Sequence, residues 1–197
     1  MNYELQIIDL VDKHNGYITT KQVEDNNIPR RFLSFLVNKK IIERISRGVY
    51  SKNDEIEDDL LVIQSKSKYA IFSNLTALYF YGLCSRTPEV IDVSVINGYK
   101  GTLQNYKNVS LYYNKKETHE LGISTIESNF GNDIKVYDIE RSICDIIKNK
   151  KRIDKELFNQ AIRGYWRTSD KNMVKLYGYA TKLNVYKKVK TIFEVLS

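Results

Sequence analysis

Two arginines and a serine near the start of the chain, Arg30, Arg31 and Ser34, have the types and spacing to bind DNA. They share one helical face with Asn38, and the segment begins at Pro29, a residue suited to the first position of a helix. Guanidinium groups donate paired hydrogen bonds to guanine or to phosphate oxygens, and Ser and Asn bond base edges or phosphates. The segment from Pro29 to Asn38 is therefore predicted to be a DNA-recognition helix.

The opposite side of this segment is apolar. Phe32, Phe35 and Leu36 fall together at helical spacing and are predicted to face the core. Lys39 and Lys40 close the segment, where cations also suit the negative end of the helix dipole, so we interpret them as phosphate contacts at most. A solvated face on a protein-docking module is the alternative interpretation of the whole pattern.

Short elements before the recognition helix are predicted to position it. Apolar residues recur every third position in residues 2–13, which indicates a helix that stops at Asn15-Gly16. After a short extended bridge, Thr19 and Gln22 have the spacing of a capping box, which predicts a helix over residues 20–25. Thr20, at its start, is a further candidate DNA contact.

A two-stranded ribbon is predicted after the recognition helix. Residues 41–45 and 49–50 have strand character, and a Ser46-Arg47-Gly48 turn joins them, which places Arg44 and Arg47 near the tip. Three helices followed by such a ribbon are typical of a winged helix-turn-helix, whose recognition helix enters the major groove and whose wing touches the backbone. We assign this DNA-binding domain to residues 1–53.

The remaining residues, 54–197, are predicted to form an α+β domain with a mostly antiparallel sheet, flanking helices and a helical C-terminus. Acidic residues 54–59 precede an apolar run and favour a helix start at the domain boundary. Ser73 is expected to cap a helix that ends at Gly82. Strands are expected at residues 69–72, 90–96, 109–113, 123–126 and 134–137, and helices from Asp138 and over 155–166, 172–182 and 185–196.

Positive charge is concentrated at the two ends of the chain. The net charge is +7, of which residues 1–52 contribute +3, residues 53–144 contribute −4 and residues 145–197 contribute +8. Such asymmetry favours a polyanionic partner, although a lysine-rich composition also arises in an AT-rich genome without selection for binding. Lys171, Lys175 and Lys182 fit one helical face, which we interpret either as a second phosphate-binding surface or as a solvated face.

Motifs for the common enzyme classes are missing. The chain has no GxxxxGK[ST], GxGxxG, GxSxG or HExxH motif, and two cysteines 60 positions apart with two histidines make a metal site improbable. We therefore expect no enzymatic activity, no cofactor and no metal. The alternative is a Mg²⁺-dependent nuclease that uses Asp133 and Lys135, with Glu89 and Asp92 upstream. Without a membrane-spanning run or a signal-peptide pattern, we expect a cytoplasmic location.

Four stretches in order resemble the AbiEi family of antitoxins: residues 16–19, 41–50, 73–83 and 136–145. The resemblance implies a winged helix that binds inverted repeats in its own promoter and a C-terminal antitoxin domain. It also implies a type IV toxin–antitoxin system of phage abortive infection, in which an AbiEii-like nucleotidyltransferase toxin is opposed without a stable complex. Two half-sites imply two copies on double-stranded DNA, as a dimer or as cooperating monomers.

The same resemblance implies roles for individual residues. Arg30, Arg31 and Ser34 fall on the recognition helix, and Arg44 and Arg47 in the wing. The antitoxin domain carries the motif Asp138, Arg141 and Asp145. We interpret Arg141 and Asp145 as a helical i, i+4 ion pair that stabilises the domain rather than as catalytic groups.

Overall fold

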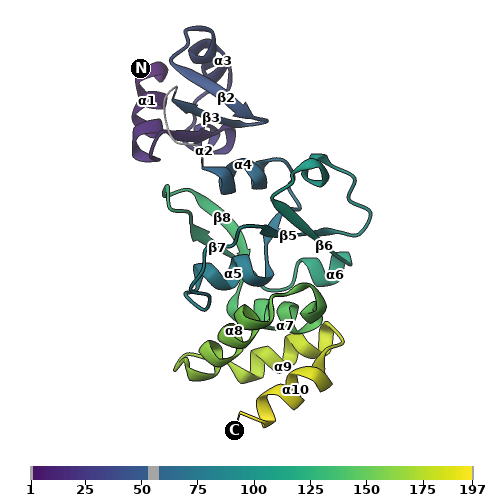
Figure 1. Ribbon diagram of the computed structural model, residues 1–197. Coiled ribbons are helices and arrows are strands. Elements are labelled where there is room, and N and C mark those ends of the chain that lie inside the picture. The colour runs from purple at the N-terminus through teal and green to yellow at the C-terminus, as the bar shows by residue number, and fades with distance from the viewer. Residues whose placement is uncertain (1, 53–57, 197) are drawn as a thin grey trace. The chain divides into compact units, whose positions relative to one another are not determined.

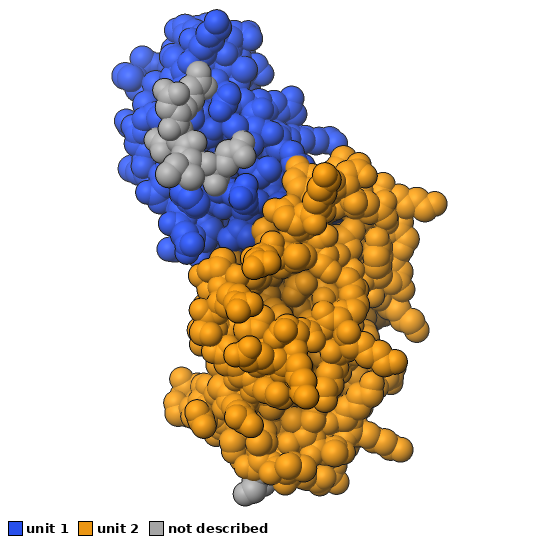
Figure 2. Space-filling view, viewed as in Figure 1, with its two compact units in different colours: residues 1–68, 125–134 blue, residues 69–124, 135–197 orange. Residues whose placement is uncertain are grey.

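The computed structural model describes residues 2–52 and 58–196, which form two compact units (Figures 1 and 2). Unit 1 comprises residues 1–68 and 125–134, and unit 2 comprises residues 69–124 and 135–197. The predicted boundary at residue 53 and acidic residues 54–57 lie outside the described residues. The assignment of domains to 1–53 and 54–197 therefore stays a prediction.

The described part of unit 1 includes three helices and a three-stranded sheet, the elements of a winged helix-turn-helix, together with a further short helix. Asn2 caps the first helix, and Thr19 and Gln22 form the predicted capping box at the second. The sheet has the antiparallel order β1-β3-β2. The elements are α1 (Tyr3–Lys13), β1 (Tyr17–Thr19), α2 (Thr20–Asp25), α3 (Arg31–Asn38), β2 (Ile42–Ser46), β3 (Val49–Lys52) and α4 (Asp59–Ser65).

The recognition helix α3 turns a different face toward the core of unit 1 than the sequence predicted. Leu33 and Leu36 are the buried residues of α3, whereas Phe32 is half-buried and Phe35 is 42% exposed. The helix packs against α1 and β2, and its core-facing positions follow from those neighbours rather than from residue size. The prediction that Phe35 faces the core is therefore wrong.

Asp58 explains why residues 125–134 belong to unit 1. Its buried carboxylate accepts hydrogen bonds from the Ser128 hydroxyl at 2.6 Å and from the Asn132 amide at 3.0 Å. The same side chain caps α4 at the Leu61 N–H, and its backbone N–H donates to the Tyr17 hydroxyl at 2.7 Å. Satisfying a buried carboxylate in this way joins segments that are distant in sequence.

Most of a five-stranded sheet, in the order β6-β5-β4-β8-β7, belongs to unit 2. The end of β7 and the start of β8 fall in residues 125–134, which are part of unit 1. The α+β class is confirmed, but the sheet is more mixed than expected, because β5 pairs with β6 and β4 with β8 in parallel. The strands are β4 (Ile71–Phe72), β5 (Ile91–Ile96), β6 (Val109–Asn114), β7 (Ile123–Glu127) and β8 (Asp133–Tyr137).

Helices make up the C-terminal part of unit 2, and α7 is central among them. Residues Glu140 to Ile147 of α7 are all buried, and they pack with α5, α8, α9 and α10. The helices are α5 (Asn74–Phe80), α6 (Lys116–His119), α7 (Ile139–Lys148), α8 (Lys155–Arg167), α9 (Met173–Lys182) and α10 (Tyr186–Glu194), with 3₁₀ turns η1 (Thr102–Asn105) and η2 (Lys150–Arg152). Throughout the described chain, every helix is too short or too polar to cross a bilayer.

The cap of α5 differs from the one expected. Ser73 occupies the N-cap position, but its side chain makes no capping hydrogen bond. The carboxylate of Asp92, from β5, instead accepts the Leu75 N–H at 3.2 Å. A residue distant in sequence therefore supplies the acceptor that Ser73 was expected to supply.

Candidate nucleic-acid interface

A concavity on unit 1 collects five of the nine DNA-binding residues predicted within residues 1–53. It is lined by residues of α2, of the start and exposed side of α3, and of the β2–β3 wing. Five residues predicted from the sequence line it together: Thr20, Arg30, Ser34, Arg44 and Arg47. Three guanidinium groups on one concave surface favour an anionic partner with a long, regular charge pattern, as in a DNA backbone.

Arg30 is paired with an acidic residue of the neighbouring helix α2. Its side chain is 69% exposed, and its Nε donates a charge-assisted hydrogen bond to the Glu24 carboxylate of α2. That bond raises the pKa of Arg30 and lowers the pKa of Glu24. Because Glu24 is bonded to Nε, the terminal nitrogens of Arg30 remain directed to other acceptors, in the fork geometry that suits guanine or phosphate.

The wing is attached to the start of α2. The backbone N–H of Thr20 donates to the Gly48 carbonyl at 2.8 Å, and the Thr20 hydroxyl lies 3.4 Å from the same oxygen. Gly48 has a φ of +80°, which glycine adopts without steric cost. Thr20 thus holds the turn that carries Arg47, while the Arg44 Nε donates to the Ser46 carbonyl at 3.3 Å.

Four other predicted contacts lie on or just after α3 and do not line the concavity. Arg31 and Asn38 are exposed on the helix, and Lys40 is exposed after it. Lys39 Nζ is 2.9 Å from the Glu4 carboxylate of α1 and 4.2 Å from the centre of the Phe35 ring. Lys39 therefore links α1 to the exposed side of α3, a role that its position at the helix end did not indicate.

Three polar residues of this surface were not predicted from the sequence. Lys21, Glu24 and Tyr50 also line the concavity. Lys21 directly follows Thr20 in the first turn of α2, so its place was accessible from the helix assignment. The bond between Glu24 and Arg30 could not be predicted, because it joins α2 to the start of α3 and the sequence does not give the angle between these helices.

Comparison with known proteins agrees with this geometry. Residues 5–51 match a family model described as "Transcriptional regulator, AbiEi antitoxin". The N-terminal segment is therefore similar to the AbiEi antitoxin family of transcriptional regulators, and residues 5–51 are called the AbiEi segment below. The match contains most of α1, all of α2 and α3 and nearly all of the wing, and it includes every residue that lines the concavity.

A solved structure extends the likeness in fold beyond the AbiEi segment. The chain is similar to the RV2827C protein from Mycobacterium tuberculosis, with a TM-score of 0.57 and 10% sequence identity, over 98% of this chain and 77% of that one. At this identity the likeness concerns the fold alone. A search of curated protein sequences gives no match.

Outside the AbiEi segment, the C-terminal lysines do not form the single face predicted. Lys171 precedes α9, and its Nζ donates to the Thr168 carbonyl at 3.1 Å. Lys175 lies 3.2 Å from the Asp138 carboxylate and 3.5 Å from that of Glu140. Lys182 is exposed at the end of α9. The three side chains therefore have different surroundings, because the helix starts two residues later than Lys171.

The motif of the C-terminal domain is structural. Asp138 caps α7 at the Arg141 N–H, at 2.9 Å, and also accepts the Tyr179 hydroxyl at 2.9 Å. Fully buried Arg141 donates its Nε to both oxygens of Asp145 at 3.1 Å, which confirms the predicted i, i+4 pair. Its Nη1 donates to the carbonyls of Thr118 and Leu121, so the arginine ties α7 to the segment before β7.

The residues of the nuclease alternative have other surroundings. Asp133 and Lys135 are exposed on β8, whereas Asp92 is buried and caps α5. Within residues 2–52 and 58–196, no three His, Cys, Asp or Glu side chains gather as a metal site would require. The geometry therefore gives this alternative no support.

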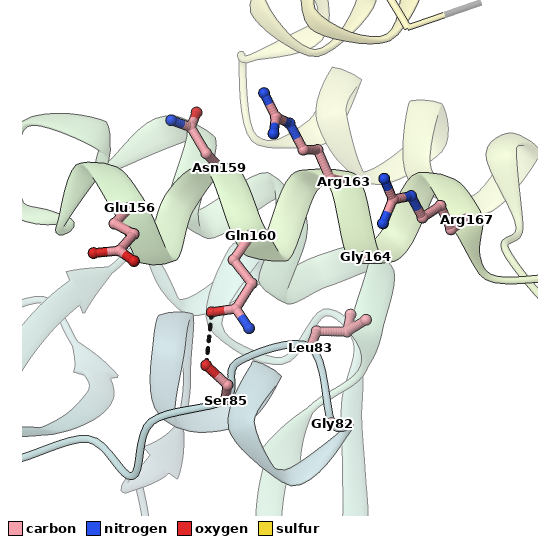
Figure 3. A pocket seen from close by; sticks show the side chains of 9 residues that line it. All are labelled: Gly82, Leu83, Ser85, Glu156, Asn159, Gln160, Arg163, Gly164 and Arg167. Atoms are coloured by element: carbon pink, nitrogen blue, oxygen red, sulfur yellow. Dashed lines mark hydrogen bonds between the residues drawn. The ribbon is translucent and has the colours of Figure 1, made fainter.

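A second concavity lies on unit 2, between α8 and the loop after α5 (Figure 3). Arg163 and Arg167 are one turn apart on α8 and exposed, and the Ser85 hydroxyl donates to the Gln160 side chain at 3.2 Å. Gly164 allows the close approach of Leu83, because a Cβ there would lie 3.1 Å from a Leu83 methyl. These arginines supply a matched comparison for those of the winged helix.

Proposed function

We propose that the protein is an autoregulatory transcriptional repressor and the antitoxin of a type IV, phage abortive-infection toxin–antitoxin operon. The observation that carries the proposal is the concavity in which Arg30, Arg44 and Arg47 meet on α3 and the wing of the AbiEi segment. In this proposal α3 enters the major groove and the wing arginines contact the backbone. Both contacts require the arrangement of helices that unit 1 has.

Glu24 gives this surface its selectivity. Its carboxylate is bonded to the Arg30 Nε, so the guanidinium meets DNA in one orientation rather than as a freely moving charge. An acidic group beside a phosphate backbone also repels non-specific DNA. Glu24 therefore trades total affinity for discrimination between sequences.

The remaining parts of the proposal are what the resemblance to the AbiEi family implies. The operator consists of inverted repeats in the protein's own promoter, occupied by two copies of the chain as a dimer or as cooperating monomers. The C-terminal domain counters an AbiEii-like nucleotidyltransferase toxin without a stable complex. The protein itself acts without enzymatic activity or a cofactor, in the cytoplasm.

The test is a fluorescence-anisotropy titration against the DNA upstream of its own coding sequence and against a scrambled duplex, at two salt concentrations. The variant Arg30→Ala/Arg31→Ala is expected to lose about 1–3 kcal/mol for each base-reading arginine and to lose its preference for the upstream DNA. The matched control, Arg163→Ala/Arg167→Ala, removes the same charge from α8 and is expected to keep that preference.

Two results would contradict the proposal. Equal binding of both duplexes by the unmodified protein would show that the winged helix does not read sequence. A protein partner that stays bound at high salt, together with no DNA binding, would instead support the docking-module alternative.

A further inference from the structure

Phe35 places an apolar ring on the exposed side of the recognition helix. The ring is 42% exposed, whereas Leu33 and Leu36 beside it are buried. At 3.6 residues per turn, Phe35 lies on the same face as Arg31 and Asn38, one turn from each. The exposed side of α3, outside the concavity, therefore carries an aromatic ring beside Arg31 and Asn38.

The ring is held in place from a neighbouring helix. Lys39 Nζ lies 4.2 Å from the ring centre, and the Glu4 carboxylate of α1 holds the same ammonium group at 2.9 Å. A cation between a carboxylate and a ring face restricts the rotamers of both side chains. Phe35 is thus presented in a fixed orientation, as a side chain that reads a base edge must be.

We infer that Phe35 is a specificity-determining residue that contacts the 5-methyl group of thymine in the major groove. The inference rests on the proposed function, because only a recognition helix in the groove brings the ring to the base edges. A phenyl ring cannot form the donor and acceptor pairs that read guanine, adenine or cytosine. The thymine methyl is the apolar group of the major-groove pattern, so thymine is the base that matches this side chain.

The experiment replaces thymine by deoxyuridine, one position at a time, in the DNA upstream of the coding sequence. Deoxyuridine keeps base pairing and the O4 acceptor and removes only the methyl group. The unmodified protein is expected to bind about fourfold more weakly for each contacted thymine replaced, the effect of burying one methyl-sized group. Phe35→Ala is expected to bind the thymine and deoxyuridine duplexes equally.

A matched variant controls for the loss of an exposed apolar side chain. Leu5 is 57% exposed on α1 of the same unit, and Leu5→Ala is expected to keep the full preference for thymine. Circular dichroism of each variant confirms that α1 to α3 remain folded.

Each other outcome overturns the inference in a distinguishable way. Selective binding of the upstream DNA with no deoxyuridine effect at any position, or with the same effect in Phe35→Ala, overturns the role of Phe35 and leaves the proposed repressor standing. Absence of selective binding to the upstream DNA overturns both.

Discussion

Burial of the Asp92 carboxylate lowers the stability of the folded protein, and the pH dependence of stability measures this effect. Its carboxylate is buried at the start of α5, and burial raises its pKa to about 6, against the opposing effect of the Leu75 N–H. The unfolded chain loses this proton near its ordinary pKa of 3.8, whereas the folded chain keeps it until about 6. The folded state therefore binds more protons in this window, and its stability falls as pH rises from about 4 to 6.

We expect Asp92→Asn to remove this loss. At about 1.4 kcal/mol per pKa unit, the variant is more stable than the unmodified protein by about 2–3 kcal/mol at pH 7 and equally stable near pH 4. Urea denaturation at several pH values measures the difference. Asp133→Asn, at an exposed position, controls for the loss of one negative charge. Parallel stability curves for the unmodified protein and Asp92→Asn would contradict the expectation.

Two ion pairs with the same i, i+4 spacing show how burial changes the contribution of an ion pair to stability. Arg141 and Asp145 are buried in α7, whereas Lys190 and Glu194 are exposed in α10. We expect Arg141→Met to lower the free energy of unfolding by about 3–5 kcal/mol, because it leaves the Asp145 carboxylate buried without a partner. Lys190→Met is expected to cost at most about 0.5 kcal/mol. Similar denaturation midpoints for the two variants would show that Asp145 finds another partner.

At the scale of elements, the sequence predicted what local chemistry determines. The helix over residues 20–25 follows from the Thr19 capping box, and the cap of α7 from Asp138. Which face of a helix packs against the core could not be predicted in the same way. Phe35 was expected in the core because it shares an apolar helical face with Phe32 and Leu36, but α1 and β2 decide which side of α3 is covered.

In the candidate site, too, local positions could be predicted from the sequence and contacts between elements could not. Arg30, Ser34, Arg44 and Arg47 were found from spacing, since Arg30 and Ser34 lie at and in one helix and Arg44 and Arg47 in one two-stranded ribbon. The bond from Glu24 to Arg30 and the link between Lys39 and Phe35 join different helices. Parallel pairing of β4 with β8 is likewise a contact across many residues, which strand propensity does not encode.

The turn between β2 and β3 depends on Gly48. Gly48 and Gly98 have nearly the same φ, +80° and +81°, but a Cβ at Gly48 would lie 3.3 Å from the Thr20 hydroxyl, and one at Gly98 would meet no atom within 4 Å. We expect both Gly→Ala variants to lose about 1–2 kcal/mol of stability from the left-handed backbone. Only Gly48→Ala is expected to weaken binding to the upstream DNA, by about tenfold, because it displaces the arginines of the wing.

Titration by fluorescence anisotropy measures both variants, with thermal denaturation alongside. Equal effects of the two alanines on DNA affinity would show that the wing does not contact DNA.

Across the whole molecule, positive charge is divided unequally between the units. Unit 2 carries 20 Lys and Arg against 11 Asp and Glu, whereas unit 1 carries 11 against 13. The winged helix therefore belongs to a unit with a net charge of −2, so for the proposed repressor we expect the long-range attraction of DNA to originate mainly in unit 2. Which of its cations also touch phosphate decides how steeply affinity falls with salt.

Two lysines of α9 distinguish contact from attraction at a distance. Lys182 is exposed, whereas Lys175 is paired with Asp138 and Glu140. We expect Lys182→Gln to reduce the slope of log affinity against log salt by about 1, the effect of one lost phosphate contact, and Lys175→Gln to leave the slope unchanged. Anisotropy titrations over a series of salt concentrations measure both slopes. An unchanged slope in Lys182→Gln would mean that α9 attracts DNA without touching it, so that the phosphate contacts lie elsewhere on the protein.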